Sequence, residues 1–287
     1  GAGVVFITIF VIIALIFAPM NTMQIAIVIL TWITMLTGFL DDKSLKGWGE
    51  YRKALLDLLI CLAATAVMLF LRKGGIKQEI LFWLPFASKQ IEVHPVVFIL
   101  VSTSLLWASI NTTNCTDGVD GLSGTLVLLG LSTMGVIFYF ILGHKDIAEY
   151  LLIPAMANGA SWAIITFSLC GVLMGYLWHN AFPSNVLMGD AGSRALGFFI
   201  GCAVMVSGNP LLIFATSSII LVNGGMGLLK VALLRFFKIK IFTTIRFPLH
   251  DHMRKNHSWS PTQVMLKFMI VQILITIAVS GIIFKIR

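Results

Sequence analysis

This sequence predicts an all-α, polytopic membrane protein, and three observations support that fold class. Hydrophobic residues make up 58% of the 287 residues and charged residues only 11%, whereas soluble globular chains average about 25% charged residues. The hydrophobic residues form runs that are long enough for helices across a ~30 Å hydrocarbon core. Helices satisfy their own backbone polar groups, as lipid requires, whereas a membrane β-barrel would show alternating segments of about 10 residues.

The hydrophobic runs predict nine membrane-spanning helices in one transmembrane domain that extends over residues 1–287. The spans are expected near 2–19, 24–40, 54–71, 95–110, 122–142, 158–178, 194–207, 211–236 and 263–286. The last-but-one run contains Asn223 and three nearby glycines, so this helix is expected to break or to be closely approached by a neighbour. In the loop 72–94, Ile80–Trp83 and Gln90–Val93 are expected to form a short external β-hairpin.

Composition also bears on the class of function. The four cysteines form no Cys-x-x-Cys pair, so the sequence indicates neither a disulfide framework nor a zinc site. The formal net charge is +8, and basic residues that flank membrane spans explain this excess without a nucleic-acid partner.

Nine alternating crossings divide the loops into two sets. One set comprises 41–53, 111–121, 179–193 and 237–262. With its adjoining helix ends it carries more Lys and Arg residues than the other set, so the positive-inside rule places it in the cytoplasm. The same set contains most of the aspartates: Asp41, Asp42, Asp117, Asp120, Asp190 and Asp251. The candidate chemistry is therefore expected on one membrane face.

The first candidate is the pair Asp41-Asp42, at the cytoplasmic end of the second span. Adjacent carboxylates repel each other unless a cation lies close, so such a pair suits Mg²⁺ binding or proton handling. Ionisable residues near a membrane are functional candidates by default. The alternative is a solvated helix cap with Lys43 and Lys46 as neighbours.

The second candidate is a polar set that recurs every third residue: Asn111, Asn114, Asp117 and Asp120. In helical or near-helical geometry, residues at this spacing share one face. The Asp-Gly steps that begin at Asp117 and Asp120 favour tight turns. The oxygen ligands and amide donors suit a hydroxyl-rich or metal-bound ligand. The alternative is a loop in which Asp120 or Ser123 caps the next helix.

The third candidate is the segment Met188–Ser193, just before a span. Its glycines permit close backbone approach, and free N–H groups at a helix start attract phosphate. Asp190 could then hold Mg²⁺ between phosphate oxygens. The alternative is helix capping by Asp190 or Ser193.

The fourth candidate is Pro248–His252, within a basic loop that attracts anions. His250 and His252 suggest a transition metal, but with Asp251 they make an incomplete zinc set. The alternative is an amphipathic loop on anionic lipid headgroups.

Together, these four segments resemble the polyprenyl-phosphate N-acetylhexosamine-1-phosphate transferase superfamily. Within it, Pro248–His252, Trp259–Val264 and Lys267–Ile270 resemble the last cytoplasmic loop of the branch that transfers phospho-N-acetylmuramoyl-pentapeptide. The resemblance covers nearly the whole chain. The family has ten transmembrane helices with external termini, so the nine spans fit if the first helix is absent here.

The resemblance implies a reaction and its site. The expected substrates are UDP-N-acetylmuramoyl-pentapeptide and undecaprenyl phosphate, and the expected products are lipid I and UMP, with Mg²⁺ as cofactor. Asp190 would be the Mg²⁺ ligand, and Asp41, Asp42 and His250 would join it in catalysis. The implied substrate-binding residues are Asn111, Asn114, Asp117, Gly118, Asp120, Asn180, Leu187, Ser193 and His252. Leu187 stands where the family often has an aromatic residue beneath the uracil.

The resemblance further implies peptidoglycan synthesis at the bacterial plasma membrane, a cytoplasmic active site, a homodimer, and uridine-containing nucleoside inhibitors. Two other functions remain as alternatives. One is the sibling enzyme that transfers N-acetylglucosamine-1-phosphate to the same carrier. The other is a secondary transporter, which would place its charges near mid-bilayer in discontinuous helices.

Overall fold

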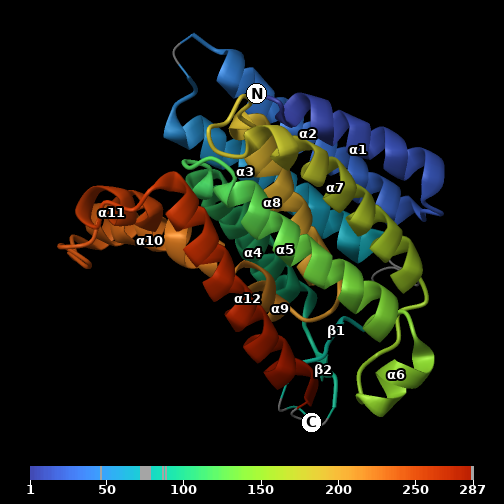
Figure 1. Cartoon of the computed structure of the whole chain (residues 1–287). Helices are drawn as coiled ribbons and strands as arrows, with labels where there is room; N and C mark the ends of the chain where they lie inside the picture. Colours follow the sequence, from blue (N-terminus) through green and yellow to red (C-terminus); the bar gives the residue numbers. More distant parts are fainter. Residues whose placement is uncertain (46, 72–78, 86, 88, 286–287) are drawn as a thin grey trace.

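The computed structural model describes the chain except for residues 46, 72–78, 86, 88 and 286–287. The described residues form a helix bundle with a small hairpin at one end (Figure 1). The long helices are α1 (Gly3–Phe17), α2 (Thr22–Lys43), α3 (Glu50–Phe70), α4 (Pro95–Thr116), α5 (Leu122–Val136), α7 (Gly159–Asn180), α8 (Gly189–Val206) and α12 (Pro261–Lys285). The shorter elements are α6 (Lys145–Tyr150), α9 (Leu212–Ile220), α10 (Met226–Ala232), α11 (Leu249–Asn256), β1 (Leu81–Phe82) and β2 (Ile91–Glu92).

The fold class predicted from hydropathy is confirmed. Among the described residues, 8 helices are long and apolar enough to cross a membrane. These 8 include the continuous stretch Leu212–Phe237, which contains α9 and α10, and they do not include α1. The span expected at 2–19 is α1, an apolar helix of only 15 residues. The span expected at 194–207 lies in α8, which begins earlier, at Gly189.

Helix α8 occupies the centre of the bundle. Within its most apolar stretch 83% of the residues are buried, against 17% for α12 at the edge. Small residues allow this central position. A side chain at Gly197 would collide with the backbone of α4, and Ser109 of α4 donates a hydrogen bond to the Gly197 carbonyl at 2.7 Å. The middle of α8 is therefore packed closely against α4.

The helix expected over 211–236 is distorted, as its glycines predicted. Ser217 interrupts the α-helical geometry, and Leu221–Gly225 forms a π-helical turn between α9 and α10. A Cβ atom at Gly224 would lie 2.5 Å from the carbonyl oxygen of Thr112 in α4. The distortion thus accompanies a close approach to α4.

The predicted hairpin is also confirmed. Strands β1 and β2 pair antiparallel, with Leu81 opposite Glu92 and Phe82 opposite Ile91. Of the expected hairpin loop, residues 72–78, 86 and 88 lie outside the described residues. Figure 1 shows the hairpin, α6 and the C-terminus at one end of the bundle, and the N-terminus and the start of α8 at the other.

Candidate active site

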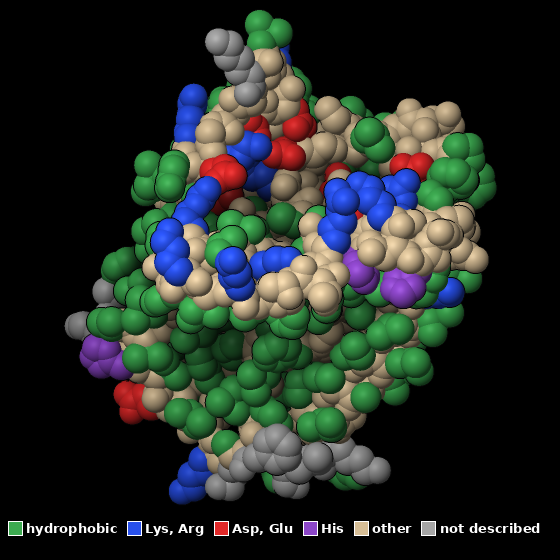
Figure 2. Space-filling view, turned by 90° about the vertical axis from the view of Figure 1, so that its left-hand side faces the viewer, with side chains coloured by type: hydrophobic (Ala, Val, Ile, Leu, Met, Phe, Trp, Pro, Cys, Tyr) green, Lys and Arg blue, Asp and Glu red, His purple; other side chains and the backbone are tan. Residues whose placement is uncertain are grey.

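Four helix ends meet at the end of the bundle opposite the hairpin: the last turns of α2 and α4 and the first turns of α3 and α8. Figure 2 shows Lys, Arg, Asp and Glu side chains gathered around a hollow at this end, above a broad band of hydrophobic side chains. The charged groups therefore lie at the boundary of the apolar surface.

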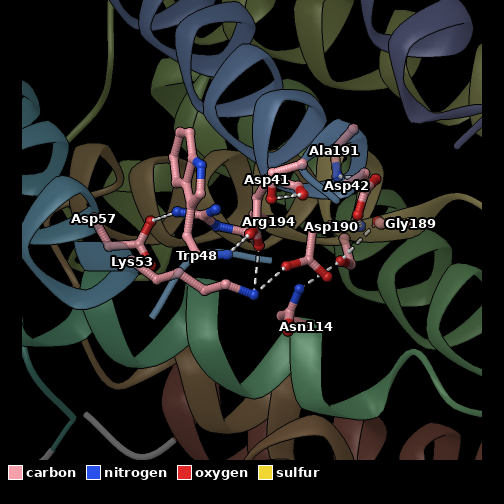
Figure 3. A network of polar contacts seen from close by, with 12 residues as sticks. Asp41, Asp42, Trp48, Lys53, Asp57, Asn114, Gly189, Asp190, Ala191 and Arg194 are labelled. Carbon is pink, nitrogen blue, oxygen red and sulfur yellow. Dashed lines mark hydrogen bonds and ion pairs between the residues drawn. The ribbon is translucent and has the colours of Figure 1, made fainter. Parts of the chain in front are cut away.

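Asp41 is the buried member of the aspartate pair. Its carboxylate accepts a hydrogen bond from the backbone N–H of Trp48 at 2.7 Å and forms an ion pair with Lys53. The Nζ of Lys53 also lies 3.2 Å from Oδ2 of Asp190 (Figure 3). Lys53 thus bridges the carboxylates of α2 and α8.

Asp42 faces a different partner. Its carboxylate accepts hydrogen bonds from the backbone N–H groups of Asp190 at 3.2 Å and Ala191 at 3.4 Å. Gly189 has a φ of +68°, and a Cβ atom there would overlap the Asp42 carboxylate. The expectation that these amides are free to bind phosphate is wrong for this structure, because Asp42 caps α8 from another helix.

The polar set beginning at Asn111 only partly shares one helix face. Helix α4 ends at Thr116, so Asn111 and Asn114 are helical, whereas Asp117 lies just beyond the last turn. The amide of Asn114 donates to Oγ of Ser193 at 3.1 Å, which joins α4 to α8. The amide of Asn111 donates back to the Trp107 carbonyl.

The pKa of Asp117 shows that several carboxylates lie near one another at this end of the bundle. Burial, and to a smaller extent the negative charges of Asp190, Asp42 and Asp120, together raise the pKa of its carboxyl to about 7. Carboxylates from α2, the α4–α5 turn and α8 therefore lie close enough to interact electrostatically.

Asp120 and Asn180 connect loops. The Asp120 carboxylate accepts hydrogen bonds from the backbone N–H of Ser184 at 3.1 Å and from its hydroxyl at 2.8 Å. Asn180 accepts from the Gly121 N–H at 2.8 Å and donates to the Val186 carbonyl at 2.7 Å. These contacts tie the turn after α4 to the loop before α8, in which the side chain of Leu187 is exposed.

His250 is buried beside the Asp117-Gly118 turn. Its backbone N–H donates to Oδ1 of Asn223 at 2.8 Å, and a Cβ atom at Gly118 would lie 2.5 Å from its Nε2. Burial lowers the pKa of His250, Asp251 opposes that shift and Arg254 adds to it. The lowered pKa favours the neutral imidazole, and the ring lies against the polar turn.

His252 does not join His250 in one site. Its Nδ1 accepts the Arg246 backbone N–H at 3.3 Å, and its ring packs against His257 at 5.5 Å. Asp251 pairs with Arg246 at 3.6 Å and Lys255 at 3.8 Å. The structure gives a transition-metal site at this His-x-His segment no support.

Three ionisable residues at the site were not singled out from sequence: Lys53, Asp57 and Arg194. Asp57 and Arg194 form an ion pair that is almost completely buried. Both fall inside predicted spans, where ionisable side chains are rare. That rarity is the signal that could have found them.

The site suits a hard cation in its chemistry. Among the described residues, no group of three His, Cys, Asp or Glu side chains forms a ready metal cage. The crowded carboxylates that raise the Asp117 pKa nevertheless leave negative charge that a divalent cation would offset. Mg²⁺ commonly takes one or two carboxylates and completes its shell with water and substrate phosphates.

A helical membrane bundle with carboxylates, a lysine and a neutral histidine at its polar boundary defines a class: integral-membrane enzymes that act on anionic substrates. Residues 24–208 match the model of glycosyl transferase family 4. The chain belongs to this family, and it is a phosphoglycosyl transferase and a multi-pass bacterial membrane protein.

Curated relatives agree with this assignment. The chain is 54% identical over 287 residues to a phospho-N-acetylmuramoyl-pentapeptide-transferase of Treponema pallidum, which covers 100% of this chain and 78% of the relative. A protein of the same name from Campylobacter curvus is 31% identical over 244 residues, covering 83% of this chain and 67% of that protein. The Campylobacter jejuni protein is 30% identical over 264 residues, with 88% and 72% covered. The resemblance noted in the sequence is confirmed.

Proposed function

We propose that this enzyme transfers phospho-N-acetylmuramoyl-pentapeptide from UDP-N-acetylmuramoyl-pentapeptide to undecaprenyl phosphate, giving lipid I and UMP in peptidoglycan synthesis. The convergence of Asp41, Asp117, Asp190 and Lys53 at the boundary of the apolar surface carries the proposal. The nucleotide donor arrives from water and the polyprenyl acceptor from lipid. A site at this boundary is reachable from both.

We further propose that this end of the bundle faces the cytoplasm of a bacterial cell. Basic residues favour the cytoplasmic side of a membrane, and Figure 2 shows a row of Lys and Arg side chains along the rim of the hollow. A cytoplasmic orientation also gives the site access to soluble UDP-sugars.

Asp190 is proposed as the principal Mg²⁺ ligand. Its carboxylate is partly exposed, while its backbone N–H is held by Asp42. A bound Mg²⁺ would neutralise the donor diphosphate and the leaving UMP. Lys53, which already spans Asp41 and Asp190, adds a fixed positive charge for two anionic reactants.

In the proposed reaction, an oxygen of the lipid phosphate bonds to the sugar-linked phosphorus, and the bond from that phosphorus to UMP breaks. A phosphate monoester has a second pKa near 6, so the acceptor is largely dianionic at neutral pH. A general base would add little. Asp41 accepts hydrogen bonds from Trp48 and Lys53, which suits charge placement and positioning.

The remaining site residues divide into two proposed groups. Asn111, Asn114, Asp117, Gly118, Ser193 and Leu187 would contact the nucleotide-sugar. Asp120, Asn180 and His250 are bonded to neighbouring loops, so they would contribute mainly by holding the site's shape. His252, half-buried in α11, would meet only the outer part of a bound substrate.

The decisive experiment measures Mg²⁺-dependent UMP release by the purified protein with undecaprenyl phosphate and each of two donors. We expect turnover with UDP-N-acetylmuramoyl-pentapeptide, loss with chelator, and a fall of about 10³-fold or more in Asp190→Ala. Turnover with UDP-N-acetylglucosamine alone would favour the sibling enzyme. Solute uptake into proteoliposomes without UMP release would favour a transporter.

Two partner assignments complete the proposal. A homodimer is expected, and the outer face of α12 offers exposed apolar side chains such as Leu274 and Ile277. Cross-linking in lipid nanodiscs tests it. Uridine-containing nucleosides are expected to inhibit in competition with the UDP-sugar, which steady-state kinetics measures.

A further inference from the structure

Two ion pairs join α3 and α8 one helical turn apart, and their polarities are opposite. The partly exposed pair is Lys53 of α3 with Asp190 of α8, and the buried pair is Asp57 of α3 with Arg194 of α8 (Figure 3). In each helix the two residues are four positions apart, which places them on the same face.

The two pairs differ in their contact with water. The Lys53 and Asp190 side chains are 36% and 28% exposed, whereas those of Arg194 and Asp57 are 3% and 2% exposed. A buried ion pair is weak evidence for stability, because well-packed apolar residues in its place are often neutral or stabilising. The buried Asp57–Arg194 pair is therefore better explained by a role in fixing one arrangement of α3 and α8 than by a contribution to stability.

Alternating polarity permits a single register. If α8 slid by one turn relative to α3, either Asp190 would face Asp57 or Arg194 would face Lys53. Both juxtapositions place like charges together, and in a site of low dielectric that repulsion is strong. The buried Asp57–Arg194 pair therefore favours the register in which Asp190 lies opposite Lys53.

We propose that Asp57 and Arg194 are positioning residues for the transfer reaction: their buried pair holds Asp190 opposite Lys53 and Asp41. The inference rests on the proposed function, because Asp190 is taken there as the metal ligand. Neither Asp57 nor Arg194 needs to touch substrate. Their contribution lies in the placement of the Asp190 carboxylate.

The test compares three variants of the full chain in lipid nanodiscs. Asp57→Leu with Arg194→Leu removes both charges and leaves no unpaired ion. Asp57→Arg with Arg194→Asp keeps an ion pair but reverses its polarity. Arg194→Lys keeps polarity without the planar fork of the guanidinium. A matched control, Thr65→Val with Thr103→Val, removes a buried polar contact of 3.3 Å between α3 and α4.

Four quantities are measured: the melting temperature, kcat, KM for the UDP-sugar, and binding of Mn²⁺ alone, followed by electron paramagnetic resonance. For the first two double variants we expect a loss of kcat of about 10- to 100-fold with KM nearly unchanged, as for a small misplacement of a catalytic group. We also expect weaker Mn²⁺ binding and a retained melting transition. Arg194→Lys and the threonine control should stay within about 3-fold of wild type.

Wild-type kcat and Mn²⁺ binding in either double variant would overturn the proposal. If the leucine variant does not fold, the polarity-reversed variant decides, because it retains a pair between the helices. Absence of transfer by the wild-type protein with any UDP-sugar would instead refute the proposed function. In that case, equal Mn²⁺ binding in all variants would still overturn the positioning role.

Discussion

Where α2 meets α8, the ion pairs of Lys53 and Arg194 join residues that are far apart in the chain, whereas in α6, at the hairpin end, an ion pair lies within one helix. Lys53 joins Asp41 and Asp190, and Arg194 joins Asp57. At the other end Lys145 and Glu149 pair within α6, at 3.7 Å and highly exposed. An ion pair between two helices restrains their relative position, whereas an exposed pair within one helix does not.

A cavity of about 520 Å³ lies at the hairpin end, and its lining, which includes Met68, Phe98 and Met205, contains no ionisable residue among those described. The proposed site is thus distinguished by ion pairs between helices, whereas this cavity is lined by apolar and uncharged polar residues.

Among the tests of this comparison, the largest effect is expected at Lys53, which bridges Asp41 and Asp190. Lys53→Met leaves buried Asp41 without its ion-pair partner and separates it from Asp190. We expect transfer to fall by about 10²- to 10³-fold, because electrostatic placement dominates phosphoryl transfer. Radiolabelled product formation measures this. Lys53→Arg is the control, and normal turnover in Lys53→Met would show that long-range pairing does not mark the site.

A smaller effect is expected at the cap of α8. Asp42→Ala leaves the N–H groups of Asp190 and Ala191 without their acceptor, which costs about 1 kcal/mol of stability for a typical cap. We expect a lower melting temperature together with reduced turnover. Asp42→Asn, which retains an acceptor oxygen, should recover the melting temperature. If both variants melt like wild type, the cap does not hold α8.

Packing behind the site gives the third test. Gly118→Ala places a methyl group against the ring of His250, which Asn223 holds in place. We expect about a 10-fold loss of kcat, since small displacements near a site are costly. Gly171→Ala, in α7, meets no atom within 4 Å and should leave kcat unchanged. Equal activities would show that His250 is free to move.

The fourth prediction concerns pH in the metal-free protein. The pKa of Asp117 is raised to about 7 in the folded protein. Between about pH 4 and pH 7, the folded protein therefore keeps a proton on this carboxyl that the unfolded chain has released. The associated stability is present at acidic pH and is lost as pH rises from about 4 to 7. The difference in melting temperature between pH 5 and pH 8 should shrink in Asp117→Asn. A divalent cation should also reduce it, because the added positive charge lowers this pKa.

The smallest effect is expected at the hairpin end. Lys145→Ala removes an exposed pair within one helix, and such pairs contribute about 0.3–0.5 kcal/mol. Turnover and melting temperature should both match wild type within error. A marked loss of activity would contradict the division between the two ends.

Hydropathy was sufficient to predict the helices, because lipid imposes long apolar runs that a sequence displays directly. Asp41, Asp117 and Asp190 could be assigned to one end because alternation of the spans determines which loops share a side. The bridge through Lys53 and the pairing of Asp57 with Arg194 could not be predicted, because they depend on the register between α3 and α8. Local sequence does not contain that register. Similarly, the contacts of Asp120 with Ser184 and of Asn223 with His250 arise only when loops meet.

The last turn of α2 contacts two different segments through its two adjacent aspartates, Asp41 and Asp42. Successive residues of a helix point about 100° apart. Asp41 therefore contacts Trp48 and Lys53, while Asp42 contacts the first backbone amides of α8. The two carboxylates cannot exchange tasks. Inserting a single alanine before Asp41 would turn both away from their partners at once, even though every side chain of the site would still be present.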